Sequence, residues 1–112
     1  MKILILGDVM GASGRRVINN NLNKIINEND INFTIINGEN SADDGRGITK
    51  EIAEELFSNC ADVITSGNHI WDKPETTDFI NLENRLLRPA NLPEDSPGNG
   101  YGIYSTKDNK FK

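Results

Sequence analysis

The chain has 112 residues, a formal net charge of −5 at pH 7, and hydrophobic residues at 36% of its positions. This length suffices for one small domain with its own core. The basic residues are scattered, which excludes the electrostatic footprint of a protein that binds duplex nucleic acid or an anionic membrane. No apolar run approaches the roughly 20 residues of a membrane span. Cys60 is the single cysteine, so no disulfide can form within the chain and we expect a cytoplasmic protein. We also expect Cys60 to be buried on the apolar side of a helix.

The first part of the chain alternates between strand and helix patterns. Residues 3–6 form a continuous apolar run, typical of a central strand that is covered on both faces. Apolar residues at helical spacing predict an amphipathic helix over about 14–28, with Ser13 as its N-cap. Further elements follow in order: a strand at 33–36, a helix that Thr49 caps, and a strand at 63–65. This βαβαβ order predicts an α/β fold with a parallel sheet and right-handed crossovers.

The pattern is looser in the remainder of the chain. We expect a short helix at 74–80 with Pro74 in its first turn, a brief strand at 86–87, and a loop at 91–100. Three elements are expected after this loop: a half-exposed strand at 101–106, a turn at 108–109, and the first residues of a returning strand at 110–112. A hairpin that stops after its turn predicts a fragment of a longer protein.

Polar residues that can bind a metal ion follow each of the first three predicted strands. Each group comes directly after a glycine: Asp8, then Glu39 with Asn40, then Asn68 with His69. Because the carboxyl ends of parallel strands meet at one edge of a sheet, we expect these side chains to converge. The set is rich in oxygen donors and includes the one histidine, which suits hard or borderline divalent metals. The sequence therefore predicts a shared metal site at this edge.

The glycines after the first strand admit a second interpretation. Gly7, Gly11 and Gly14 resemble a glycine-rich dinucleotide loop, and Glu39 could serve as the acid that binds a ribose. The spacing is not Gly-x-Gly-x-x-Gly, and Asp8 puts a carboxylate where a pyrophosphate would lie. A nucleotide-binding Rossmann-like module is therefore the alternative to a metal site.

Four segments carry a family resemblance: Gly7-Asp8-Val9, Asn37-Gly38-Glu39-Asn40, Gly67-Asn68-His69-Ile70-Trp71-Asp72-Lys73 and Arg88-Pro89-Ala90-Asn91. Together they resemble the YmdB-like 2′,3′-cyclic-nucleotide phosphodiesterases, a bacterial branch of the calcineurin-like metallophosphoesterases. The chain departs from the general superfamily pattern at Met10, Glu39 and Ile70, and these departures are those of the YmdB-like branch. The resemblance implies that residues 1–112 are the N-terminal part of a single metallophosphoesterase domain. They would form the start of a two-sheet sandwich whose C-terminal half is absent.

The resemblance also implies a role for each polar residue at the strand ends. Asp8 would bind one metal ion, and Glu39 would bridge that ion to a second. Asn40 and Asn68 would bind the second ion. His69 would be the catalytic proton donor for the leaving group. In the family, histidines from the C-terminal half complete this site, whereas this chain has one histidine.

The implied activity is metal-dependent hydrolysis of a small phosphodiester or nucleotide by two divalent ions, with Fe or Mn expected. Asp72 is a candidate partner that would help to keep His69 protonated. Because many metal ligands are missing, we expect the 112-residue chain alone to be inactive or nearly so. An uncovered sheet edge or face could let copies associate into a homo-oligomer. A further interpretation is a truncated half-domain that binds a partner without catalysis.

Overall fold

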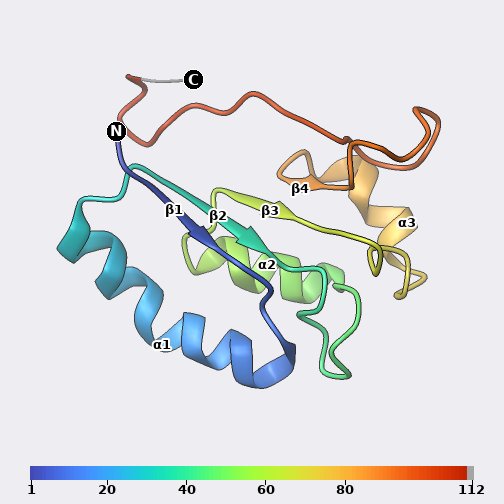
Figure 1. Ribbon diagram of the computed structural model, residues 1–112, viewed down its shortest axis with the longest axis horizontal. Helices are drawn as coiled ribbons and strands as arrows, with labels where there is room; N and C mark the ends of the chain where they lie inside the picture. Colours follow the sequence, from blue (N-terminus) through green and yellow to red (C-terminus); the bar gives the residue numbers. More distant parts are fainter. Residues whose placement is uncertain (111–112) are drawn as a thin grey trace.

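The computed structural model describes residues 1–110. One four-stranded parallel sheet contains, in the order of the chain, β1 (Ile3–Leu6), β2 (Phe33–Asn37), β3 (Val63–Thr65) and β4 (Leu86–Leu87). The helices are α1 (Gly11–Asn29), α2 (Lys50–Ser58), α3 (Thr76–Phe79) and the short 3₁₀ helix η1 (Ile80–Leu82) (Figure 1). The predicted α/β fold with a parallel sheet is confirmed. No helix within residues 1–110 is long and apolar enough to cross a membrane.

A row of aliphatic side chains runs across the sheet and forms the centre of the core. The strand register aligns Leu6 with Ile36, Ile36 with Ile64, and Ile64 with Leu86. Three of these residues, Ile36, Ile64 and Leu86, are completely buried. This shared register brings the carboxyl ends of the strands to one edge, where the polar residues follow.

Helices α1 and α2 lie on the same face of the sheet (Figure 1). The strand order is sequential, so each crossover steps in the same direction, and crossovers of one hand then place every helix on one side. The buried residues of the two helices are Ile18, Leu22, Ile26, Ile52, Ala53 and Leu56. The hydrophobic core therefore lies between this face and the two helices.

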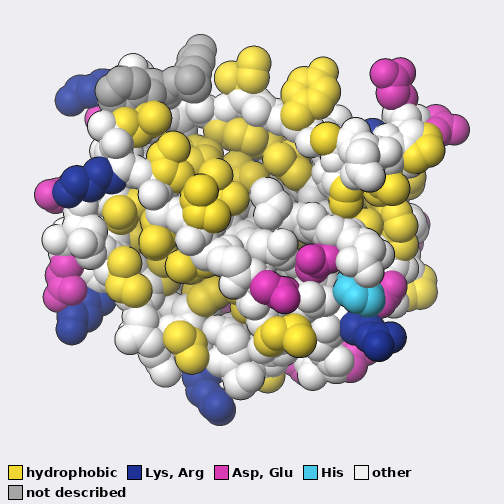
Figure 2. Space-filling model, in the orientation of Figure 1, with side chains coloured by type: hydrophobic (Ala, Val, Ile, Leu, Met, Phe, Trp, Pro, Cys, Tyr) yellow, Lys and Arg dark blue, Asp and Glu magenta, His cyan; other side chains and the backbone are white. Residues whose placement is uncertain are grey.

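The opposite face is open near β1, so the prediction that residues 3–6 are a central strand covered on both faces is wrong. β1 is an edge strand of the described sheet, with Ile3 46% and Ile5 70% exposed. A cavity of 490 Å³ on this face is lined by β1, β2 and residues 102–106. Figure 2 shows hydrophobic side chains gathered over β1 and β2. Because all the crossovers lie on the other side, this apolar face has no helical cover.

Helix α1 begins earlier than predicted, and Ser13 is not its N-cap. The helix starts at Gly11 after Met10, and no side chain caps it. The Ser13 hydroxyl instead donates to the Met10 carbonyl at 3.4 Å. The backbone of Gly11 is left-handed (φ 55°), and its N–H donates to the Asn40 carbonyl at 2.9 Å. The neighbouring loop thus satisfies a helix N–H group that a side-chain cap would otherwise serve.

Three smaller predictions have mixed outcomes. Thr49 caps α2 as predicted, because its side chain accepts a hydrogen bond from a backbone N–H of the first turn. Pro74 precedes α3 by two residues and does not lie in its first turn. Cys60 lies beyond the α2 C-cap residue Asn59, so its predicted place on the helix is wrong. The Cys60 backbone is left-handed (φ 74°) and its side chain is half-buried. The Cys60 Sγ lies 2.9 Å from the Asn23 side-chain oxygen.

Residues 101–106 do not form the predicted strand. They pair with no strand of the described sheet. The Tyr104 ring lies 6.2 Å from the Phe33 ring of β2, whereas Tyr101 and Ile103 are more than 80% exposed. The predicted turn at 108–109 is confirmed, because Asn109 is left-handed and its N–H donates to the Thr106 carbonyl at 2.8 Å. Most of the returning strand predicted at 110–112 lies outside the described residues.

We predict that Ile5→Lys reduces self-association of the chain. Ile5 is 70% exposed on the open sheet face, so a lysine there adds charge to the apolar patch without removing a buried contact. Sedimentation velocity over a range of protein concentrations measures the effect. Leu82→Lys is the matched control, because Leu82 is 87% exposed but lies on η1 and not on the sheet. A wild-type chain that stays monomeric, or an equal effect of both substitutions, would contradict the prediction.

Candidate functional site

Backbone hydrogen bonds hold the loops together at the carboxyl edge of the sheet. The Val9 N–H donates to the Asn37 carbonyl at 3.0 Å, which joins the ends of β1 and β2. The Gly38 N–H donates to the Thr65 carbonyl at 3.0 Å, which joins the ends of β2 and β3. The side chains that follow the three strands are therefore carried on loops with fixed relative positions.

Asp8 and Asn40 are in direct contact. Asp8 follows β1 and has a left-handed backbone (φ 39°), which is uncommon for a residue with a side chain. Its Oδ1 accepts a hydrogen bond from the Asn40 Nδ2 at 2.7 Å. The amide oxygen of Asn40 then remains available as an acceptor or ligand. A strained backbone held by such a contact is typical of functional sites.

Glu39 packs against the backbone of Gly67. A Cβ atom at Gly67 would lie 2.6 Å from the carboxyl carbon of Glu39, so no other residue fits there without moving this carboxylate. The His69 N–H donates to the Glu39 Oε2 at 3.5 Å, a long hydrogen bond. The carboxylate that follows β2 is thereby brought against the loop that follows β3.

The predicted partner of His69 is in place. The Nδ1 of His69 lies 2.8 Å from the Asp72 Oδ2, and the two side chains are 30% and 36% exposed. Within residues 1–110, the His69 Nε2 has no hydrogen-bond partner. Asn68 is exposed, and its side chain makes no hydrogen bond to Asp8, Glu39 or any other residue of the described chain.

The donor set fits a hard divalent cation only in part. Neither Asp8 nor Glu39 forms an ion pair with a lysine or arginine of residues 1–110. Carboxylate and amide oxygens are the ligands that such cations prefer. No group of three or more His, Cys, Asp and Glu side chains in the described chain is arranged to hold a metal ion. Water or another protein segment would have to supply the remaining ligands.

Comparison with known proteins identifies the family. A family model described as "YmdB-like protein" matches residues 4–112. The chain belongs to the YmdB-like family. It is 48% identical over 100 residues to the 2′,3′-cyclic-nucleotide 2′-phosphodiesterase of Bacillus subtilis, a match that covers 89% of this chain and 38% of that protein. The predicted family is confirmed, and the Rossmann-like alternative is not supported.

Two solved structures of similar proteins share the fold. A hypothetical protein from Thermus thermophilus superposes with a TM-score of 0.84 at 31% identity, covering 94% of this chain and 40% of that one. A novel phosphatase from Mycoplasma pneumoniae superposes with a TM-score of 0.82 at 32% identity, covering 93% and 39%. This YmdB-like chain therefore spans about 40% of the length of the relatives that it matches.

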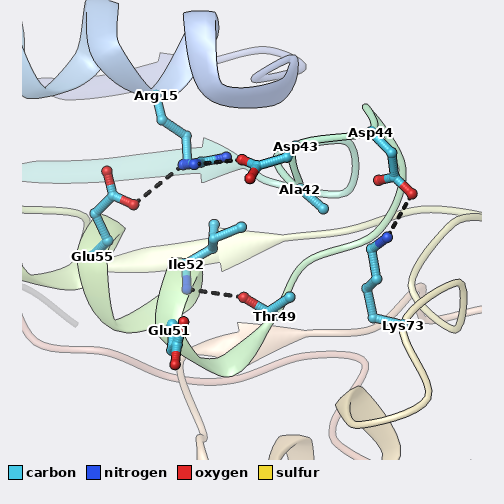
Figure 3. A pocket seen from close by; sticks show the side chains of 9 residues that line it. All are labelled: Arg15, Ala42, Asp43, Asp44, Thr49, Glu51, Ile52, Glu55 and Lys73. Carbon is cyan, nitrogen blue, oxygen red and sulfur yellow. Dashed lines mark hydrogen bonds and ion pairs between the residues drawn. The ribbon is translucent and has the colours of Figure 1, made fainter.

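A largely buried arginine holds the loop after β2 in this YmdB-like chain (Figure 3). The Arg15 side chain is 14% exposed and extends from α1. Its Nε lies 3.2 Å from a Glu55 carboxylate oxygen, its Nη2 lies 2.8 Å from the Asp43 Oδ1, and its Nη1 donates to the Ser41 carbonyl. The sequence analysis missed Arg15, because its partners lie 26 to 40 positions away and no local spacing indicates them.

A second ion pair ties the same loop to the segment after β3. The Lys73 Nζ lies 2.6 Å from the Asp44 Oδ2, and this hydrogen-bonded ammonium lowers the pKa of the Asp44 carboxyl. The pair therefore stabilises the fold at neutral pH, and its contribution is lost as the pH falls through the pKa of the folded state. A cavity of 510 Å³ beside these residues is lined by Arg15 and Lys73, whose charges are already paired within the protein (Figure 3).

We predict that Arg15→Met destabilises the fold by roughly 1–3 kcal/mol, because the buried Ser41 carbonyl and the Glu55 carboxylate lose their partner. Arg16→Met is the control, because the exposed Arg16 forms no ion pair with residues 1–110 and its loss should change stability by less than about 0.5 kcal/mol. Urea unfolding midpoints measure both. Equal midpoints for the two variants would show that Arg15 does not hold the loop.

Proposed function

We propose that this chain contributes the N-terminal part of a metal-dependent active site that hydrolyses 2′,3′-cyclic nucleotides or related phosphodiesters. The observation that carries the proposal is the meeting of three strand ends, with Asp8 bonded to Asn40 and Glu39 packed against the loop of His69. The name of the Bacillus subtilis relative, a 2′,3′-cyclic-nucleotide 2′-phosphodiesterase, supports the substrate class.

Four side chains of this chain would hold the metal ions, for which we expect a pair of Fe or Mn ions. Asp8 would bind one ion, Glu39 would bridge the two, and Asn40 and Asn68 would bind the second. Bound divalent ions would supply a Lewis acid that neutralises phosphate oxygens and lowers the pKa of a water. The Asn40 amide N–H groups point to Asp8, which leaves the amide oxygen of Asn40 as the atom that can ligate.

His69 would carry the proton that the leaving alkoxide needs. The Nδ1 contact with Asp72 would orient the imidazole ring and leave its Nε2 to face the substrate. A positioned general acid of this kind contributes about 10²–10⁴-fold to a rate. Asp72 would therefore be a positioning residue, because it acts through His69 and touches no reacting atom.

The same donor set argues for little or no activity in the 112-residue chain alone. A pair of metal ions needs about four to six donors per ion, and the described residues supply two carboxylates and two amides, with His69 reserved for proton transfer. A second candidate is a half-domain that binds a partner without catalysis. Metal stoichiometry of the complete gene product separates the two candidates.

We predict that two substitutions in the complete gene product both lower activity but differ in their effect on metal content. His69→Ala should lower kcat by roughly 10²–10⁴-fold and leave the metal content nearly intact, because a proton donor is not needed to hold the ions. Glu39→Ala should lose metal and activity together, because one carboxylate serves both ions. Elemental analysis, with turnover of a 2′,3′-cyclic nucleotide and of an activated phenyl phosphodiester, measures both effects.

Asp78→Ala is a suitable control, because this exposed carboxylate on α3 has no ion pair with residues 1–110 and lies outside the candidate site. It should match the wild type in metal content and turnover. Metal loss in the His69 variant would show that the two roles are wrongly assigned. Full metal content in the Glu39 variant would contradict the proposed site.

A further inference from the structure

A cavity with a different chemistry borders the candidate site at Asn68. It has a volume of 330 Å³ and lies between the segment that follows β3 and the segment that follows β4. Trp71, Pro89 and Leu92 supply apolar walls, and Asn68 and Asn91 supply side-chain amides. We call this space the Trp71 cavity. Its volume falls at the lower end of the range of small-molecule sites, roughly 300–1,000 Å³.

One wall of the Trp71 cavity is held by a buried arginine. Arg88 is 8% exposed and pairs with no carboxylate of residues 1–110. Its guanidinium donates to the carbonyls of Pro89 at 3.1 Å, Leu92 at 3.4 Å and Gly98 at 3.3 Å. A buried charge is tolerated only where such bonds replace water, so the segment around it is held in one conformation. The wall is thus formed before any ligand binds.

The lining of the Trp71 cavity indicates the kind of group that fits. No lysine, arginine, aspartate or glutamate lines it, so nothing there would balance the charge of a phosphate. Trp71 is half-buried and packs against the hydrophobic core, so its indole ring is held on one side and partly exposed to another ring. The side chain of Asn91 makes no hydrogen bond within residues 1–110, so its donor and acceptor are both available to a ligand. A flat, neutral heterocycle with a hydrogen-bonding edge meets all three conditions.

We propose that the Trp71 cavity binds the nucleobase of a nucleotide whose phosphate lies at the Asp8–Glu39 site, an inference that rests on the proposed function. Gly67 lines the cavity and also packs against the Glu39 carboxylate, so the two sites adjoin. The base would stack on the indole ring of Trp71, and the Asn91 amide would hydrogen-bond to its edge. Base recognition would then distinguish a nucleotide substrate from a generic phosphodiester.

Trp71 is the only tryptophan of the chain, so its fluorescence reports directly on the cavity. We would titrate the chain with 2′,3′-cyclic AMP in MgCl₂, with ribose 5-phosphate as the probe that lacks a base. Stacking predicts a saturable change of emission with the cyclic nucleotide and none with ribose 5-phosphate. Asn91→Ala should keep the emission signal and weaken cyclic AMP binding severalfold, whereas Asn20→Ala, an exposed asparagine on α1, should not.

Calorimetric titration with the same nucleotide tests the stacking itself. Trp71→Leu should weaken binding roughly 5- to 150-fold, and Trp71→Phe should weaken it less because a phenyl ring still stacks. The Phe variant and Asn91→Ala keep the test valid where the Leu variant fails to fold.

An unchanged emission, an equal response to ribose 5-phosphate, or equal affinities of all variants would overturn the proposal. Turnover and metal content of the complete gene product separately test the hydrolase. Metal-dependent turnover of the phenyl phosphodiester without these nucleotide effects would contradict base binding in the Trp71 cavity and leave the proposed hydrolase standing.

Discussion

The close packing of the Glu39 carboxylate on Gly67 is the constraint on which the rest of the candidate site depends. It joins the end of β2 to the end of β3, and a single methyl group at Gly67 would force the carboxylate away. The contact between Asp8 and Asn40 makes the corresponding connection between β1 and β2. Neither the Asp8 nor the Glu39 carboxylate pairs with a lysine or arginine of residues 1–110, so a bound cation would balance their charge.

The sheet topology explains both the site and the exposed surface. A sequential parallel order brings the strand ends to one edge, and it also places α1 and α2 on a single face. The other face has no helical cover, and Ile3 and Ile5 are exposed there. The chain spans about 40% of the length of the solved structures that it matches.

The sequence predicted what local patterns determine. The apolar runs and helical spacing located β1 to β4 and α2, and strand topology predicted that Asp8 and Glu39 would reach the same edge. The wrong predictions concern contacts between distant segments. Ser13 was expected to cap α1, whereas the loop after β2 serves that end of the helix, and Arg15 was missed because its partners lie on other elements. The strand expected at 101–106 needs a pairing partner, which an alternating pattern cannot guarantee.

The central claim is that Asp8 and Glu39 lie at a cation site. Anomalous diffraction from crystals of the chain soaked in millimolar MnCl₂ tests it most directly, because the manganese edge locates the ion itself. The account predicts an anomalous peak within roughly 2.0–2.6 Å of a carboxylate oxygen of Asp8 or Glu39. Peaks confined to exposed acids elsewhere, such as Asp43, with none at these two carboxylates, would contradict it.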